Sequence, residues 1–272
     1  MISKPSVGGT LLGLWLAVGA VAAPATDAPA PAAGPPTGGR SPFGASGALP
    51  PDAPKPSADP HDLRGLYYMH MAGPLLPGID KKNPPLTPAG LAVFRQRLAN
   101  HDAGLVPDDP QVQCRPMNAA RMYGTGFPQV QIIQSANEIV ILLMEDHITR
   151  RIALNGQHPA HLAPTYLGDS IGHWEGDTLV VDTIGFRDDS WLDETGTPGD
   201  HNEHLIERFR KVDGGSKLED QVTIEDPGVF SQPLSFTVPF TWRPDATWDE
   251  IICEEGNRDA VDGSPSGAGA KP

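Results

Sequence analysis

The stretch Gly168–Phe186, GDSIGHWEGDTLVVDTIGF, carries the clearest structural signal in the chain. Its second half is rich in apolar and β-branched residues, and a short run of this kind between turn residues is typical of a strand. The polar link Glu175–Asp177 has a glycine at its centre, which favours a tight turn. The stretch therefore predicts two antiparallel strands, near Asp169–Trp174 and Thr178–Ile184.

Segments of the same character continue on both sides of this hairpin. Further strands are expected near Gln129–Gln134, Glu138–Glu145, His147–Leu154, Glu203–Val212, Lys217–Glu225, Leu234–Arg243 and Thr247–Glu254. Successive strands joined by short turns predict an antiparallel meander. Closing a meander into a barrel removes its exposed edges, so a mostly β protein with a closed barrel is expected. A two-sheet β-sandwich is the alternative.

One short helix is predicted N-terminal to these strands. Thr87 favours the N-cap position, and Pro88 suits the first helical turn. An apolar stripe with helical spacing follows, made of Leu91, Phe94 and Leu98. Asn100 is the expected end of the helix.

The N-terminus has the three parts of a secretory signal peptide. Lys4 supplies the positive charge, Leu11–Val21 is an uncharged apolar run, and Ala20–Ala22 is a small-residue cleavage site. The apolar run is shorter than the ~20 residues that a membrane-spanning helix needs. We therefore expect no membrane insertion after signal removal, and a periplasmic or secreted protein.

Composition divides the remaining chain into three parts. Residues 23–60 are rich in Pro, Ala, Gly and Ser, and residues 260–272 have the same character. Such segments bury too little apolar surface to offset their chain entropy, which predicts a disordered spacer and a disordered tail. Residues 61–259 between them are enough for one β-barrel domain.

The chain has two cysteines, Cys114 and Cys253. An even number of cysteines in an exported protein favours a disulfide, because the compartment is oxidising. Such a bond would join the start of the folded region to its end. Two buried free thiols are the alternative.

The charge of the chain restricts its partners. It has 20 Lys and Arg against 34 Asp and Glu, a formal net charge of −14. An acidic chain repels nucleic acid phosphates and anionic lipid surfaces, so neither is an expected partner. A neutral or cationic small organic molecule is accepted more easily.

The long hairpin stretch, together with four shorter segments, resembles a family of uncharacterised secreted bacterial proteins. The shorter segments are Trp191–Asp193, His204–Phe209, Thr223–Pro227 and Cys253–Asp259. The resemblance covers about Asp62 to Asp259 and implies a lipocalin-like β-barrel, without a particular reaction. Departures from the family pattern near Arg115–Arg121, Pro198–Asp200 and Gln232–Leu234 mean that no ligand contact is carried over at those positions.

Acidic residues inside apolar strands are the candidate catalytic groups. Asp182, Glu207 and Glu254 each stand beside apolar neighbours. A carboxylate that is buried without a partner is costly, so it gains a partner or its pKa shifts. Two carboxyl groups with separated pKa values can act as general acid and general base, and His204 is a further candidate base. His204 and Glu207 point to opposite faces of a regular strand, however. The alternative is a structural role, in which Asp182 binds backbone amides of the following loop and Glu207 pairs with Arg150 or Arg151 across strands.

Aromatic and basic residues are the candidate ligand contacts. Tyr123, Trp191 and Trp242 are expected to line an apolar cavity or to belong to the core. Arg150 and Arg151 are expected either to contact a ligand or to pair with Glu207 across strands.

No cofactor is predicted, because the chain lacks phosphate-loop, dinucleotide and nucleophile-elbow motifs. A metal is the less favoured alternative, through His158 with His161 or His201 with His204. Zinc needs three or four ligands, and pairs with this spacing supply only two.

Three classes of function stay open. The first is an enzyme that performs cofactor-free acid–base chemistry, of the lyase, isomerase or hydrolase type, on a small organic molecule held in the barrel. The second is a binding or carrier protein for a small apolar ligand. The third is an interaction module of the cell envelope. The carboxylates within strands favour the enzyme.

Overall fold

The computed structural model describes residues 48–70, 75–106, 108–124, 129–145, 148–246, 248 and 253. The predicted signal peptide, the predicted tail, Glu254 and most of the predicted spacer lie outside the described residues. The end of the spacer contacts the barrel: the Lys211 ammonium donates to the carbonyl of Ser57, and the Trp242 indole donates to that of Pro54 at 3.2 Å.

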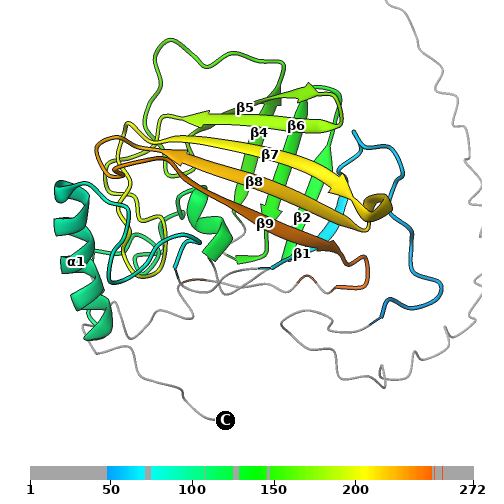
Figure 1. The fold of residues 1–272 in the computed structure, drawn as a ribbon. Helices are drawn as coiled ribbons and strands as arrows, with labels where there is room; N and C mark the ends of the chain where they lie inside the picture. The colour runs from blue at the N-terminus through cyan, green and yellow to red at the C-terminus, as the bar shows by residue number, and fades with distance from the viewer. Residues whose placement is uncertain are drawn as a thin grey trace, which may run out of the picture. The chain divides into compact units, whose positions relative to one another are not determined.

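Nine strands form one closed, lipocalin-like barrel in which neighbours in sequence are neighbours in space (Figure 1). The strands are β1 Gly65–Met69, β2 Gln129–Gln134, β3 Glu138–Leu143, β4 Thr149–Leu154, β5 Asp169–Glu175, β6 Thr178–Ile184, β7 His204–Val212, β8 Lys217–Glu225 and β9 Leu234–Trp242. The predicted barrel is therefore confirmed, and the sandwich is excluded.

The meander departs from the prediction at one seam. β4 and β5 pair in parallel, starting at Ile152 beside Ser170, whereas every other neighbouring pair is antiparallel. Parallel strands need a long connection instead of a hairpin. Here the connection is the segment 155–168, which returns the chain before β5 begins.

The strand that closes the barrel comes from the N-terminal side, where none was predicted. β1 pairs with both β2 and β9. A Cβ atom on Gly65 would lie 1.8 Å from the Trp242 ring, so this glycine lets the indole pack directly on the β1 backbone. The strand predicted at Thr247–Glu254 falls mostly outside the described residues, and Trp248 there is outside any strand.

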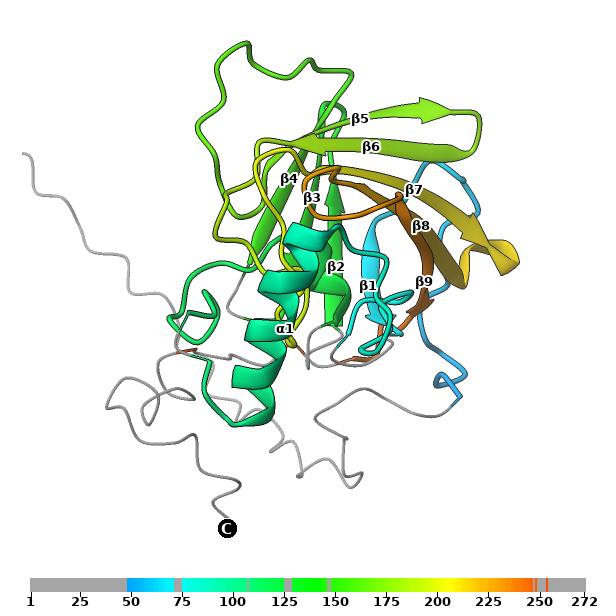
Figure 2. The same ribbon diagram turned by 60° about the vertical axis from the view of Figure 1, so that its left-hand side comes forward.

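The α-helix α1, Pro88–Asp102, lies at one end of the barrel (Figures 1 and 2). The Thr87 hydroxyl accepts the amide proton of Gly90 at 3.1 Å, which confirms the predicted N-cap. Gly90 approaches the carbonyl of Val229 so closely that a Cβ atom there would lie 2.5 Å from it. With 15 residues and a place after β1, this helix is neither short nor N-terminal to the barrel.

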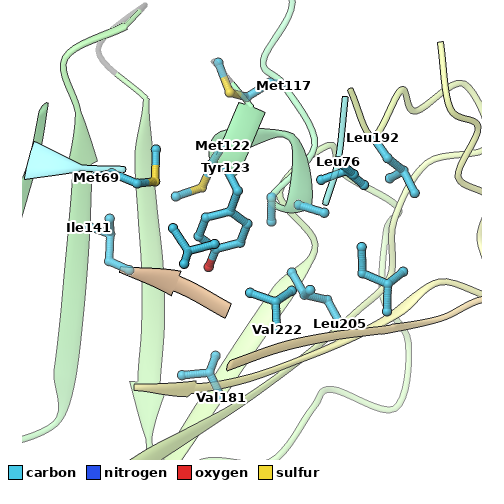
Figure 3. Packing of buried hydrophobic residues seen from close by; sticks show 14 of the residues in the cluster. Met69, Leu76, Met117, Met122, Tyr123, Ile141, Val181, Leu192, Leu205 and Val222 are labelled. Atoms are coloured by element: carbon cyan, nitrogen blue, oxygen red, sulfur yellow. The ribbon is translucent and has the colours of Figure 1, made fainter. Parts of the chain in front are cut away.

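The interior of the barrel is filled with side chains. Residues 117–123 are all buried, and they include the first four residues of the short helix η1, Ala120–Gly124. Figure 3 shows Met122 and Tyr123 among apolar residues of the barrel wall, including Met69, Ile141 and Val222. The apolar space that a ligand would need inside the barrel is thus occupied by the chain itself.

Cys114 and Cys253 form the predicted disulfide, with their Cα atoms 5.6 Å apart. The chain-entropy estimate for so long a loop is roughly 4–5 kcal/mol. Among the described residues, no helix has the length and apolar character needed to cross a bilayer.

Candidate functional site

A charged network lies inside the barrel. Arg150 on β4 donates through both terminal nitrogens to Glu207 on β7, one of these bonds measuring 2.6 Å. The same guanidinium donates to Thr183 at 2.9 Å and contacts the hydroxyl of Ser170 at 3.3 Å. The Arg150 and Glu207 side chains are 1% and 0% exposed, so the pair is shielded from solvent. Burial alone would lower the pKa of Arg150, but the charge of Glu207 raises it.

The phenol of Tyr123 joins two carboxyl groups of this interior network. Its oxygen contacts Glu207 and lies 2.5 Å from Asp220 Oδ2. A phenol has one proton, so both contacts are hydrogen bonds only if one carboxyl group is protonated. Arg150 stabilises the charged form of Glu207, which leaves Asp220 as the protonated group. Burial and the charge of Glu207 raise the pKa of Asp220 well above its ordinary value, in agreement with this proton count.

The interior network therefore serves the fold. It joins β4, β7 and β8 to η1. Its four ionisable residues are all buried: Arg150, Glu207, Tyr123 and Asp220. A buried ion pair with its hydrogen bonds satisfied is weak evidence for stability, but removing one partner is strongly destabilising.

A second network lies on the outer face of β5, β6 and β7. His204 Nε2 lies 2.8 Å from Asp182 Oδ2, and His158 Nε2 lies 2.9 Å from Asp182 Oδ1. The other nitrogen of His158 lies 2.6 Å from Asp169 Oδ1. We call Asp169, His158, Asp182 and His204 the outer relay. Their side chains are 17% to 37% exposed, so the relay is in partial contact with solvent.

The relay alternates carboxyl groups and imidazole rings. Burial alone would lower the pKa of His158, but hydrogen bonds to Asp169 and Asp182 raise it. Burial alone would raise the pKa of Asp182, and the two histidines lower it. An imidazolium ring donates from both nitrogens, which fits the two carboxylates around His158.

A pocket of about 630 Å³ opens beside the outer relay at the seam between β4 and β5. Thr149, Arg151 and Ala153 line it from β4, and residues 164–168 line it from the connection. Asp169, the first residue of β5, also lines the pocket. One carboxylate is therefore shared by the pocket and the relay.

The structure separates the predicted catalytic residues. Asp182 and His204 meet on the outer face, whereas Glu207 points into the barrel, as the alternation along β7 requires. Glu254 lies outside the described residues. Asp182 and Glu207 therefore lie on opposite faces of the barrel wall and cannot act as an acid–base pair.

The predicted ligand contacts divide in the same way. Arg150 and Arg151 line the pocket. Tyr123 belongs to the interior network. Trp191 is buried with the guanidinium of Arg97 4.8 Å from its ring centre, and Trp242 packs edge-on against Tyr67 at 5.5 Å. Neither tryptophan lines the pocket.

Asp220, Asp169, Ser170 and Thr183 were not predicted as site residues, and His158 was considered only as a metal ligand. Asp220 stands between Leu218 and Val222 on the buried face of β8, so its strand pattern carried a detectable signal. Asp169 and His158 are brought together by the path of the connection 155–168, which no local pattern reveals.

The two predicted histidine pairs do not act as pairs. His158 belongs to the relay, whereas His161 is exposed. His201 pairs with Asp188 at 2.6 Å, and His204 pairs with Asp182. Within the described ranges, no group of three or more His, Cys, Asp or Glu is arranged to hold a metal.

Comparison of the chain with protein-family models, with curated proteins and with solved structures gives no match.

Proposed function

We propose that this protein is a periplasmic or secreted enzyme that performs cofactor-free acid–base chemistry on a small organic molecule held in the pocket between β4 and β5. The observation that carries the proposal is the position of Asp169, which lines the pocket and is bonded to the relay through His158. Perturbed titratable groups beside a concave site are the physical mark of an active site.

Asp169 is the proposed catalytic residue. Its Oδ1 atom is bonded to His158, and among the described residues Oδ2 makes no hydrogen bond. Oδ2 is thus available to take a proton from a bound molecule or to return one. Proton transfer by a positioned side chain of this kind contributes about 10²–10⁴-fold to a rate.

His158, Asp182 and His204 are positioning residues. His158 holds Asp169 in place, and Asp182 holds His158 in turn. After Asp169 has given a proton to a bound molecule, the His158 imidazolium can donate its Nδ1 proton to Asp169, and the neutral ring then takes a proton from solvent, with which it is in partial contact. Hydrogen bonds to Asp169 and Asp182 raise the pKa of His158, which favours the protonated ring.

The interior network supports the pocket from behind. Arg150 and Ser170 line the pocket and also belong to the interior hydrogen bonds. The wall behind the pocket is therefore fixed by a buried ion pair, which holds an active site more precisely than a loop does.

The test is a screen for conversion in deuterium oxide. Mature protein is incubated with pools of small organic acids, esters, lactones and enones, and each compound is followed by mass spectrometry for conversion or deuterium uptake. We expect activity on at least one compound and a loss of about 100-fold in Asp169→Asn.

The matched control is Glu175→Gln, because Glu175 ends the same strand and pairs with Arg208 away from the pocket. It should keep the activity of the natural protein. The proposal fails if no compound is converted, or if Asp169→Asn is as active as the control.

A second candidate is a binding protein without catalysis. The observation in its favour is the apolar part of the pocket wall, which Pro116, Ala153, Pro164 and Leu167 form. A ligand that is retained and recovered unchanged would support this function.

A further inference from the structure

We infer that the molecule taken by the pocket is a small organic anion, a carboxylate in particular. This inference rests on the proposed function only for the location of the site. Three arginines, Arg150, Arg151 and Arg187, line the pocket against two carboxylates, Glu138 and Asp169. Each guanidinium has a carboxylate partner, so the case for an anion rests on the N–H donors that the arginines present to the pocket and not on a net positive charge.

Arg151 presents an open guanidinium fork. Its Nε atom donates to Glu138 at 2.6 Å, and its two terminal nitrogens make no hydrogen bond within the described part of the chain. The side chain is 73% exposed, so the pair with Glu138 contributes little to stability. Two adjacent terminal N–H groups match the two oxygens of a carboxylate.

Arg187 is held more firmly on another wall of the pocket. Its Nε and Nη2 atoms donate to Asp189 at 2.7 and 3.1 Å, and its guanidinium lies 4.9 Å from the ring centre of Tyr166. Both contacts fix the plane of the guanidinium and leave Nη1 for a ligand. Tyr166 also lines the pocket, so an aromatic surface stands beside this donor.

The two carboxylates in the lining already have partners of their own. Glu138 is paired with Arg151, and Asp169 is bonded to His158, whose pKa is raised. Arg150 is neutralised by Glu207 inside the barrel, so the selectivity is assigned to Arg151 and Arg187. We therefore propose an anionic ligand, in place of the neutral or cationic ligand that was expected from the net charge of the chain.

The experiment compares benzoate with benzamide, which has the same shape without the charge. Binding to the mature protein is followed at pH 7 by amide NMR shifts of Tyr166 and Asp169. Benzoate should bind at least about tenfold more tightly, and added salt should weaken it because charged contacts at the surface are screened.

Arg151→Gln and Arg187→Gln should each reduce the preference for benzoate, and the double variant should abolish it. Arg208→Gln is the matched control, since Arg208 is an arginine about as exposed as Arg187 and is paired with Glu175 outside the pocket. It should keep the full preference. Equal binding of benzoate and benzamide, binding of neither, or a preference that survives the double variant overturns the inference.

The outcome separates this inference from the proposed function. Asp169→Asn removes a negative charge from the pocket and should bind benzoate at least as tightly as the natural protein. A benzoate preference without conversion of any acid leaves the anion site standing and removes the enzyme. Conversion of a neutral compound without any preference for benzoate supports the enzyme and overturns the anion site.

Discussion

Asp182 on β6 and Glu207 on β7 are carboxylates on neighbouring strands with opposite surroundings. Glu207 is fully buried and bound to Arg150 and Tyr123, whereas Asp182 is 37% exposed between two histidines. The two residues are separated by the barrel wall. Their comparison shows how two neighbouring strands supply a shielded network on one face and a partly exposed one on the other.

The difference arises from the partners that each face offers. Inside the barrel, a permanent cation and a protonated carboxyl group leave no group free to exchange protons with solvent. On the outer face, the partners are imidazoles, which titrate near neutral pH. The interior network is therefore expected to control stability, and the outer relay to control chemistry.

Glu207→Ala should have the largest effect on stability. It leaves the Arg150 guanidinium buried without its counter-ion, which costs about 3–5 kcal/mol of unfolding free energy. Urea denaturation of the mature protein measures this loss. Glu175→Ala, which breaks an exposed pair with Arg208, should cost less than about 1 kcal/mol. Similar losses of unfolding free energy for both variants would show that the buried pair is no more important for stability than the exposed pair.

Tyr123→Phe should have the next largest effect. It removes the hydroxyl between Glu207 and Asp220 and takes one hydrogen-bond partner from each, at about 1–3 kcal/mol, while Glu207 keeps Arg150 and Asp220 keeps the amide of Arg208. Tyr166→Phe is the control, because Tyr166 is only partly buried and donates to Asp189 at 3.0 Å on the outer side. Urea denaturation of the two variants should rank them in this order. A smaller loss for Tyr123→Phe than for Tyr166→Phe would show that the phenol does not hold the interior network.

The pH dependence of stability should separate the two networks by its sign. The pKa of Asp220 is raised on folding, so its contribution is fully present below the ordinary aspartate value of 3.8 and is lost as pH rises towards the folded pKa. The pKa of Asp182 is lowered, so its contribution is present above 3.8 and is lost as pH falls through the folded pKa.

Asp220→Asn tests this sign. The amide can still donate to Tyr123, so the fold should persist, and the loss of stability above pH 3.8 that Asp220 causes should disappear. Thermal unfolding between pH 4 and pH 8 measures it, with the natural protein as reference. An unchanged slope in Asp220→Asn would mean that Asp220 is ionised in the folded protein.

Asp182→Asn should have the smallest effect on stability, below about 1 kcal/mol, because its partners are partly exposed. Any turnover found in the screen should fall in this variant nonetheless. His173→Gln, which alters an exposed histidine on β5, is the control and should change neither quantity. A loss of stability comparable to that of Glu207→Ala would show that Asp182, like Glu207, holds the fold together.

Local patterns predicted the barrel, the N-cap at Thr87, the disulfide and the opposite directions of His204 and Glu207. These features depend on strand alternation, capping chemistry and compartment, which are all readable in short segments. β1 was missed because its partners β2 and β9 are distant in sequence. The pocket was missed because the parallel seam and the connection 155–168 bring His158 to Asp169 only in the folded chain.

The central claim is that Asp169 at the pocket is coupled to the outer relay through His158. The most direct test is an NMR titration of the His158 side-chain nitrogens in the natural protein and in Asp169→Asn. The account predicts a His158 pKa above the ordinary value of 6.5 in the natural protein and a clearly lower pKa in the variant. A His158 pKa that is ordinary, or that is the same in both proteins, would contradict the account.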